Sequence, residues 1–450
     1  MTKQQRLVII VSILASFVSF LDGSVVNVAL PAIAKELGGG LVTQQWVVDA
    51  YLITLGALIM VAGSLSDLFG RKRILRAGLI GFGITSILCA VAPSSAFLIL
   101  SRGLQGVFGA LLVPSSLALI ISTFSGKEQG KAIGTWTAWT GMAFIFGPLL
   151  GGFFVDTLSW RWIFAINVVP IVVTLWLMRW LSQADPAKKV GVDVLGAGLC
   201  AVGLGSTVYA LIEQSHYGWS SPQILVPLVV GLLLLAAFIW HESKDPEPML
   251  PLSLFKVRNF AYGNLATLAI YGGLSVAMFL VVVFVQQVAG YSAIQAGLTL
   301  MPVTLIMFFL SSRFGALSST YGPRLFMTLG PIIGAAGFLL MLRAGAHVHY
   351  WTELFPGVVV FGLGLSITVA PLTSAILGSI DSSHAGIGSA VNNAVARIAG
   401  LIAIAGVGLV IGSTLTTAGF HNGLIATAAL LAAGGIISGF GIRNNQLTEN

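Results

Sequence analysis

Two ionisable residues, Asp22 and Arg102, stand inside long apolar stretches of the sequence. At 1.5 Å per helical residue, Asp22 lies roughly 15 Å and Arg102 roughly 10 Å from the outer ends of their predicted helices. Desolvation favours the neutral, protonated form of a carboxyl group, whereas a nearby guanidinium favours the charged form. Such a pair can load and release a proton as the distance between its members changes. The alternatives are a static ion pair and a structural, hydrogen-bonding aspartate.

Further polar residues lie near these two or in other apolar stretches. Asp49 is predicted to join the pair, although an aspartate is favourable near the start of any helix. Candidates to contact a substrate or to line its pathway are Gln105, Asn264, Tyr271, Gln286, Gln287, Asn393 and Arg397. Asn392 lies beside Asn393 and is a further candidate. For Arg397, the alternative is pairing with backbone carbonyls or extension to the membrane interface. The sequence carries no Walker loop, nucleophile elbow or H-E-x-x-H motif, so it predicts no enzyme, no metal site and no cofactor.

Residues 63–73 form a glycine-bounded loop with charges of both signs. Gly63 and Gly70 permit close packing and a tight reversal of the chain. Asp67 follows a predicted helix, whose negative dipole end makes a carboxylate unfavourable unless a positive group meets it. Arg71 or the N-terminus of another helix can supply that charge. We expect a conformational latch here; the alternative is a solvated loop that fixes the topology.

A second glycine pattern lies in residues 141–152. Gly147 and Gly151 are four residues apart, so they present a flat face to a neighbouring helix, and Gly152 extends it. Pro148 removes a backbone hydrogen bond and is predicted to bend the helix there. A bent, closely packed helix is suited to rocking or sealing.

Composition shows what surrounds these residues. The chain has 450 residues, of which 56% are hydrophobic and 8% charged, against roughly 25% charged in a soluble domain. A membrane-spanning helix needs about 20 mostly apolar residues. Fourteen stretches qualify, near 7–32, 45–66, 74–92, 95–122, 132–155, 161–181, 194–213, 223–241, 260–286, 293–313, 325–343, 352–378, 388–412 and 423–441.

The basic residues test this count. If the N-terminus is cytoplasmic, seventeen of the 22 lysines and arginines fall on the cytoplasmic side of the fourteen spans. This is the positive-inside pattern, and it accounts for the net charge of +7 without nucleic acid. We therefore expect a multi-pass membrane protein with both termini in the cytoplasm.

The loop pattern occurs twice. Residues 63–72 and residues 315–324 both read G-x-L-S-x-x-(aromatic)-G-x-(basic), eight predicted helices apart. Parallel six-helix repeats would place two extra helices between the copies. The predicted architecture is therefore all-α: a six-helix bundle over residues 1–185, two inserted helices over 186–258, and a second six-helix bundle over 259–450. A chance glycine-rich turn is the alternative.

From about residue 6 to residue 443, the sequence resembles the fourteen-helix drug:proton antiporter branch of the major facilitator superfamily. The resemblance is carried by residues 21–31, residues 63–73, Arg102-x2-Gln105-Gly106, Gly147-Pro148-x2-Gly151-Gly152, and residues 160–170. The glycine-proline pattern is the most discriminating of these for export. In two respects the sequence departs from some members: it has no acidic residue deep in its last six spans, and its last outer loop is short.

The resemblance implies proton coupling at Asp22 and Arg102, gating at Asp67 and Arg71, and an outward seal at the glycine face. It predicts alternating access, driven by the proton gradient, in a chain that works as a monomer within the lipid bilayer. Its partners would be protons and small hydrophobic or amphiphilic molecules, the substrates of multidrug efflux. Two other functions stay open: export of one specific metabolite or lipid, and a membrane receptor that transports nothing.

Overall fold

The computed structural model describes residues 1–124, 126–181, 193–246, 248–345, 347–380, 385–412 and 414–444. Within these residues the fold is helical and contains no strand. Fourteen segments are long and apolar enough to cross a membrane, so the predicted number of spans is confirmed, and their bounds agree with the prediction to within a few residues.

The clustering of contacts divides the chain into two units. Met1–Thr207 with Val229–Met249 form the first, and Val208–Leu228 with Leu250–Asn450 form the second. The predicted three-part division at residues 185 and 258 stays a prediction.

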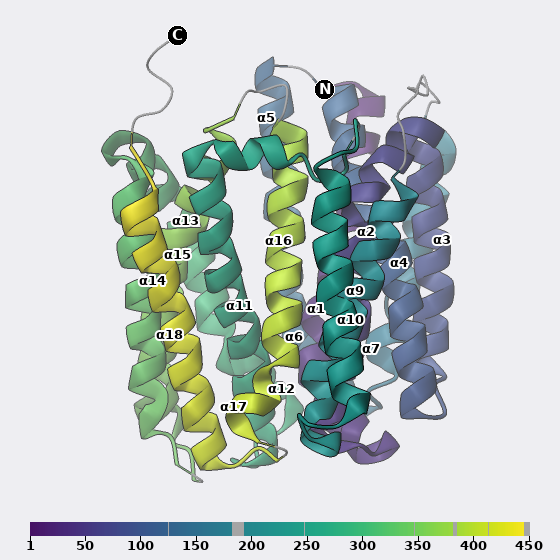
Figure 1. The fold of residues 1–450 in the computed structure, drawn as a ribbon. Helices are drawn as coiled ribbons and strands as arrows, with labels where there is room; N and C mark the ends of the chain where they lie inside the picture. The colour runs from purple at the N-terminus through teal and green to yellow at the C-terminus, as the bar shows by residue number, and fades with distance from the viewer. Residues whose placement is uncertain are drawn as a thin grey trace. The chain divides into compact units, whose positions relative to one another are not determined.

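The first unit contains eight helices and most of two more. They are α1 (Lys3–Leu37), α2 (Gly40–Phe69), α3 (Arg71–Ala90), α4 (Ser95–Thr123), α5 (Gly126–Gly141), α6 (Ala143–Thr157), α7 (Trp162–Ala165), α8 (Val168–Leu177), the short 3₁₀ turn η1 (Met178–Trp180), and parts of α9 (Val194–Tyr217) and α10 (Pro222–Glu242). In this unit α4 packs against α2 and α3, and α1 packs against α4 and α6 (Figure 1). Its core includes Val18, Leu79, Phe82, Leu112 and Ile171.

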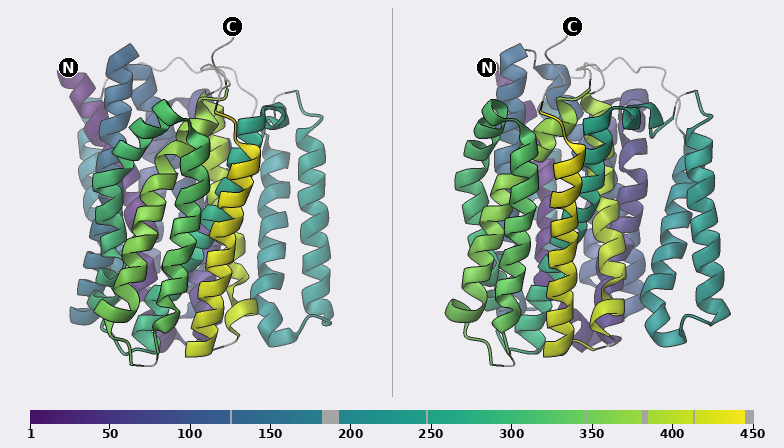
Figure 2. Two further views of the ribbon diagram at one scale, coloured as in Figure 1. Left: turned by 90° about the vertical axis from the view of Figure 1, so that its left-hand side faces the viewer. Right: turned by 60° about the vertical axis from the view of Figure 1, so that its left-hand side comes forward.

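The second unit contains η2 (Leu252–Lys256), α11 (Arg258–Gln287), α12 (Ala293–Thr299), α13 (Met301–Tyr321), α14 (Pro323–Leu340), η3 (Met341–Arg343), the π-helical turn η4 (Tyr350–Leu354), α15 (Phe355–Leu377), α16 (Ala385–Ala405), α17 (Val407–Ile411) and α18 (Thr417–Gly441). Here α15 packs against α13 and α14, and α18 packs against α11 and α14. Figure 2 shows α14, α15 and α18 side by side in both views.

Four spans that the sequence analysis treats as continuous are interrupted, at Met142, at residues 166–167, at Leu300 and at Gly406. Pro170 has no N–H to donate to the carbonyl of Ile166, and that carbonyl accepts from Val169 instead. Pro302, two residues after the interruption at Leu300, likewise has no backbone N–H to donate. At the fourth interruption the residue is Gly406, and glycine is a weak helix former. Pro148, predicted to bend its helix, lies within α6, and the interruption comes six residues earlier.

The two copies of the loop pattern have the same backbone. Gly70 has φ +91° between α2 and α3, and Gly322 has φ +84° between α13 and α14. Residues with a side chain rarely adopt positive φ, so glycine permits both reversals. The internal repeat predicted from residue types is therefore also a repeat of local structure.

Candidate functional site

Asp22 of α1 and Arg102 of α4 form a buried ion pair in the first unit. Arg102 Nη1 donates to Asp22 Oδ2 at 2.5 Å, and the two side chains are 2% and 0% exposed, respectively. Arg102 Nε donates to the carbonyl of Val47 in α2 at 3.0 Å. Its guanidinium also lies 4.3 Å from the centre of the Tyr51 ring, close enough for a cation–π interaction. The arginine is thus fixed by a carboxylate, a carbonyl and an aromatic face.

Two amides complete the surroundings of the carboxylate. Gln105 Nε2 donates to Asp22 Oδ1 at 3.0 Å, and Asn167 Nδ2 donates to the same oxygen at 2.9 Å. Ser86 Oγ accepts from both amides, at 2.9 and 3.4 Å, and Gln105 Oε1 accepts from Arg102 at 2.6 Å. We call Asp22, Ser86, Arg102, Gln105 and Asn167 the Asp22 cluster.

Close helix packing positions this cluster. A Cβ at Gly106 would collide with the Tyr51 carbonyl and the Thr54 hydroxyl, so only a glycine lets α4 approach α2 this closely. Thr54 Oγ1 donates to the carbonyl of Gly103 at 2.7 Å and joins the two helices. Arg102 lies one helical turn before Gly106. The close contact between α4 and α2 therefore places Arg102 beside Val47.

The cluster provides the elements of a protonation switch. Every donor that reaches Asp22 stabilises its charged form, and burial opposes that form. A buried ion pair holds only while its geometry is intact, because separating the partners leaves each charge without compensation. Movement of α4 or α8 relative to α1 would therefore favour proton uptake by Asp22, and return of the donors would favour release.

Sequence reasoning missed Asn167 and Ser86 as members of this site. Asn167 appeared only as part of the pattern over residues 160–170, and Ser86 was not singled out. Both are fully buried and lie within apolar stretches, so their polarity was the available signal. Gln105, predicted to contact substrate, is also fully buried, with its amide bonded inside the cluster.

Asp49 differs from the prediction that it joins the pair. It is fully buried in α2, but neither of its carboxylate oxygens has a hydrogen-bond partner among the described residues. The structure does not bring Asp49 into the hydrogen-bonded cluster.

The predicted gating residues belong to two segments, the loop at residues 63–73 and the glycine pattern of α6. Of the loop residues, Gly63 lies in α2, Gly70 makes the reversal, and Arg71 begins α3. Asp67 lies in α2, and its side chain is outside the described part of the structure. The latch therefore stays a prediction.

The glycine pattern of α6 forms a close contact with α1. A Cβ at Gly147 would collide with the Ser24 side chain, and one at Gly151 would come within 2.9 Å of a Val25 methyl group. Ser24 Oγ donates to the carbonyl of Ala143 at 2.9 Å. The part of the predicted face formed by Gly147 and Gly151 therefore lies against α1, beginning two residues after Asp22, and Gly152 is also buried.

The candidates in the second unit do not form one site. Asn264 accepts a hydrogen bond from Asn392 Nδ2 at 3.1 Å, and Asn392 also donates to Thr267 at 2.9 Å. The neighbouring Asn393, which was predicted together with Asn392, is half-buried. Asn264 and Gln286 lie on one continuous helix, roughly 30 Å apart at 1.5 Å per residue, so they cannot contact one small molecule.

The other three candidates are more open. Gln287 is exposed at the end of α11, and Tyr271 and Arg397 are each half-buried, in α11 and α16 respectively. Tyr271 lies within electrostatic range of Arg397.

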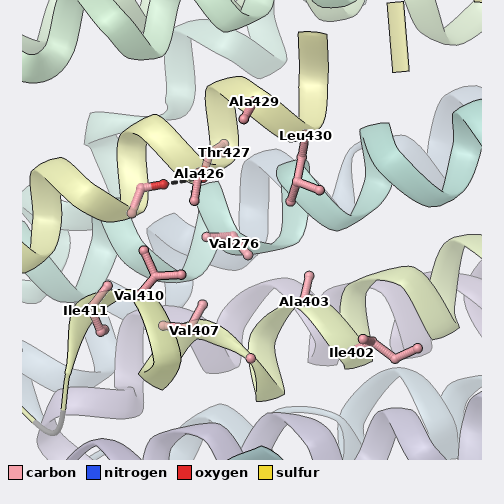
Figure 3. A pocket seen from close by; sticks show the side chains of 12 residues that line it. Val276, Ile402, Ala403, Val407, Val410, Ile411, Ala426, Thr427, Ala429 and Leu430 are labelled. Atoms are coloured by element: carbon pink, nitrogen blue, oxygen red, sulfur yellow. Dashed lines mark hydrogen bonds between the residues drawn. The ribbon is translucent and has the colours of Figure 1, made fainter. Parts of the chain in front are cut away.

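The second unit also contains an apolar cavity of about 430 Å³ between α11, α16, α17 and α18. Figure 3 shows its lining: Val276, Ile402, Ala403, Gly406, Val407, Val410, Ile411, Gly423, Ala426, Thr427, Ala429 and Leu430. Thr427 is its one polar side chain, and that hydroxyl donates to the carbonyl of Gly423 at 2.8 Å. The cavity therefore suits an apolar group, and none of the predicted substrate-binding residues is among those that line it.

Comparison with known proteins gives relatives that cover most of the chain. The chain is 33% identical to the multidrug transporter protein MdtP of Bacillus subtilis, over 86% of this chain and 72% of that protein. It is 32% identical to the multidrug resistance protein Stp of Mycobacterium tuberculosis, over 92% of this chain and 78% of that protein. It is also 32% identical to the methylenomycin A resistance protein of Bacillus subtilis, over 95% of this chain and 92% of that protein.

Solved structures share the fold at low sequence identity. A peptide transporter POT in complex with sulfate gives a TM-score of 0.72 at 14% identity, covering 97% of this chain and 94% of that one. A D-xylose-proton symporter gives a TM-score of 0.70 at 14% identity, covering 98% of this chain and 99% of that one. The sequence model of the Major Facilitator Superfamily matches residues 12–404. On the breadth of that match and of the relatives, the chain belongs to the Major Facilitator Superfamily.

Proposed function

We propose that this protein is a proton-coupled secondary transporter that exports small amphiphilic molecules by alternating access. The observation that carries the proposal is the Asp22 cluster: a fully buried carboxylate whose charge depends on donors from α4 and from the start of α8. An ionisable residue within a membrane span is expensive and marks ion or proton pathways. The cluster has the chemistry of a proton site and, by itself, says nothing about the substrate.

The relatives support the export of drug-like molecules. Two of them are named for multidrug transport or resistance. The close contact of Gly147 and Gly151 with α1 begins two residues after Asp22, so a change at the proton site can be transmitted to the helix that we expect to seal the outward side. In this mechanism, proton uptake at Asp22 loosens the cluster, and substrate leaves from the outward-open form.

Several finer features belong to the same proposal. The protein would lie in a bacterial inner membrane with both termini in the cytoplasm, and it would work as a monomer without a cofactor. The proton gradient would supply the driving force.

The test is dye uptake into energised inverted vesicles, whose outer surface is the cytoplasmic one, with and without a protonophore, for the wild type and for Asp22→Asn. We expect the protonophore to abolish wild-type transport and Asp22→Asn to lack gradient-driven transport while remaining folded. Asp156→Asn is the matched control, because Asp156 is exposed near the end of α6. Undiminished transport by Asp22→Asn would overturn the proposal.

Export of one specific compound is the second candidate. It is favoured by relatives that are named for a single antibiotic, such as the methylenomycin A resistance protein. A panel of structurally unrelated dyes and antibiotics separates the two functions, because a multidrug exporter lowers the accumulation of several of them and a dedicated exporter that of one at most.

A further inference from the structure

Four ionisable residues meet where the start of α9 lies beside the end of α10. Asp193 directly precedes α9, His241 and Glu242 are the last two residues of α10, and Asp245 follows. All four belong to the first unit. Figure 2 shows the two helices as an adjacent pair, and the approach of Gly203 to Leu235 confirms that they pack together. None of these residues belongs to the Asp22 cluster, and the proton mechanism does not use them.

The distances suit a small cation. His241 Nε2 lies 2.9 Å from Asp193 Oδ1 and 3.5 Å from Asp245 Oδ2. One ligand atom from each of the three residues lies within 4.8 Å of the others. In a tetrahedral zinc site the metal–ligand distances of about 2.0–2.2 Å separate neighbouring ligand atoms by about 3.3–3.6 Å. Both nitrogen–oxygen distances are within a few tenths of an ångström of that range.

Asp193 has an oxygen that its structural role does not explain. Its Oδ1 accepts from the backbone N–H of Gly196 at 2.7 Å, so it caps the N-terminus of α9. The side chain is 5% exposed, and Oδ2 is buried without a hydrogen-bond partner in the part of the chain that the structure describes. A buried carboxylate oxygen in this situation is costly unless a positive ligand reaches it.

A second buried carboxylate lies beside the first. Glu242 is 2% exposed, and a Cβ at Gly196 would collide with carboxylate oxygens of both Asp193 and Glu242. His241 lies within hydrogen-bond distance of Asp193, and the nearby Lys244 side chain is exposed. Three carboxyl groups and one imidazole therefore lie together at this place, and these are groups that bind divalent cations.

We propose that Asp193, His241 and Asp245 bind one divalent cation of the zinc type. Imidazole and carboxylate ligands together suit Zn²⁺. Glu242 or a water molecule would take the fourth position. The bound ion would join the ends of α9 and α10, which the distribution of basic residues predicts to be cytoplasmic.

The test measures metal binding directly and does not depend on transport. Purified protein in detergent is stripped with a chelator and titrated with ZnCl₂ alone, and bound zinc is counted by mass spectrometry after desalting. We expect one zinc ion per chain and a higher unfolding temperature with zinc than with magnesium. A wild-type protein that retains no zinc would overturn the proposal.

Two variants locate the ion. Asp193→Asn keeps an N-cap residue of equal quality but removes a charged ligand, and His241→Gln removes the imidazole. We expect each to weaken zinc binding by about 10–100-fold or more, since even changes to outer partners of metal ligands have effects of that size. His216→Gln, an exposed histidine in the last turn of α9, is the matched control and should bind as the wild type does. Unchanged affinity in both site variants would assign any bound zinc elsewhere and contradict the proposal.

Discussion

At the scale of single residues, the buried ion pair of the Asp22 cluster contributes little to folding stability for what its burial costs. Arg102 is 1% exposed, and its charge is balanced by one carboxylate at 2.5 Å. Removing one member of a buried ion pair typically costs about 3–5 kcal/mol, whereas replacing both by neutral groups is often tolerated. The pair is therefore better explained by a role in transport than by its contribution to folding.

We predict that Asp22→Asn unfolds at a lower temperature than the wild type, because it leaves the Arg102 charge buried without its counter-ion. The double variant Asp22→Asn, Arg102→Met should recover most of the loss, although neither variant should transport. Unfolding can be followed with a thiol-reactive dye, because Cys89 and Cys200 are both free and buried. A double variant less stable than Asp22→Asn would contradict this account of the pair.

Asn167 gives a prediction about the Asp22 cluster. Its Nδ2 is one of three donors to the Asp22 carboxylate, so Asn167→Ala should loosen the cluster and lower gradient-driven efflux. Asn27→Ala is the control, because Asn27 lies on the same helix as Asp22 and donates to the local carbonyl of Gly23. Equal efflux from the two variants would show that the Asn167 hydrogen bond is not needed for transport.

At the scale of helices, the contact between α1 and α6 is tested by adding one methyl group. Gly147→Ala would drive a Cβ into the Ser24 side chain, and overpacking typically costs about 1–3 kcal/mol. Gly134→Ala in α5 meets no atom within 4 Å and should be neutral or slightly stabilising, since alanine is the better helix former. We expect efflux to fall strongly in Gly147→Ala alone. Equal efflux from the two variants would show that the close contact is not needed for transport.

The same scale shows what sequence could and could not predict about the helices. Spans of about 20 apolar residues are imposed by the bilayer, so all fourteen were found. Their interruptions at Met142 and Leu300 lie within stretches that remain apolar. Such helices are apolar on every side, so periodicity does not indicate which face is buried. Asn392 and Asn393 were therefore predicted together, and it is Asn392, about 100° from Asn393 round the helix, that makes the contact with Asn264.

The candidate site was partly predictable for a related reason. A charge in an apolar stretch is expensive, so Asp22 and Arg102 stood out from sequence, and their similar depth indicated that they meet. A buried amide or hydroxyl costs less and has many structural uses, so Asn167 and Ser86 gave too weak a signal. Asp49 had the right residue type and an approximate depth, but depth alone does not specify the direction of a side chain.

At the scale of the whole molecule, the proposed orientation follows from charge and span number together. Fourteen spans return the C-terminus to the side of the N-terminus, and the basic residues place that side in the cytoplasm. The chain has two cysteines, so a cysteine-free background needs only two substitutions. Single cysteines at Thr2, Ser220 and Asn444 then report on the two ends of the chain and on the connection between α9 and α10.

We expect Ser220→Cys to react with a membrane-impermeant maleimide in intact cells, because an odd number of spans, seven, separates it from the N-terminus. Thr2→Cys and Asn444→Cys should react only after the membrane is permeabilised. Labelling of Thr2→Cys alone in intact cells would indicate an odd total number of spans, and labelling of both termini but not of Ser220→Cys would reverse the orientation.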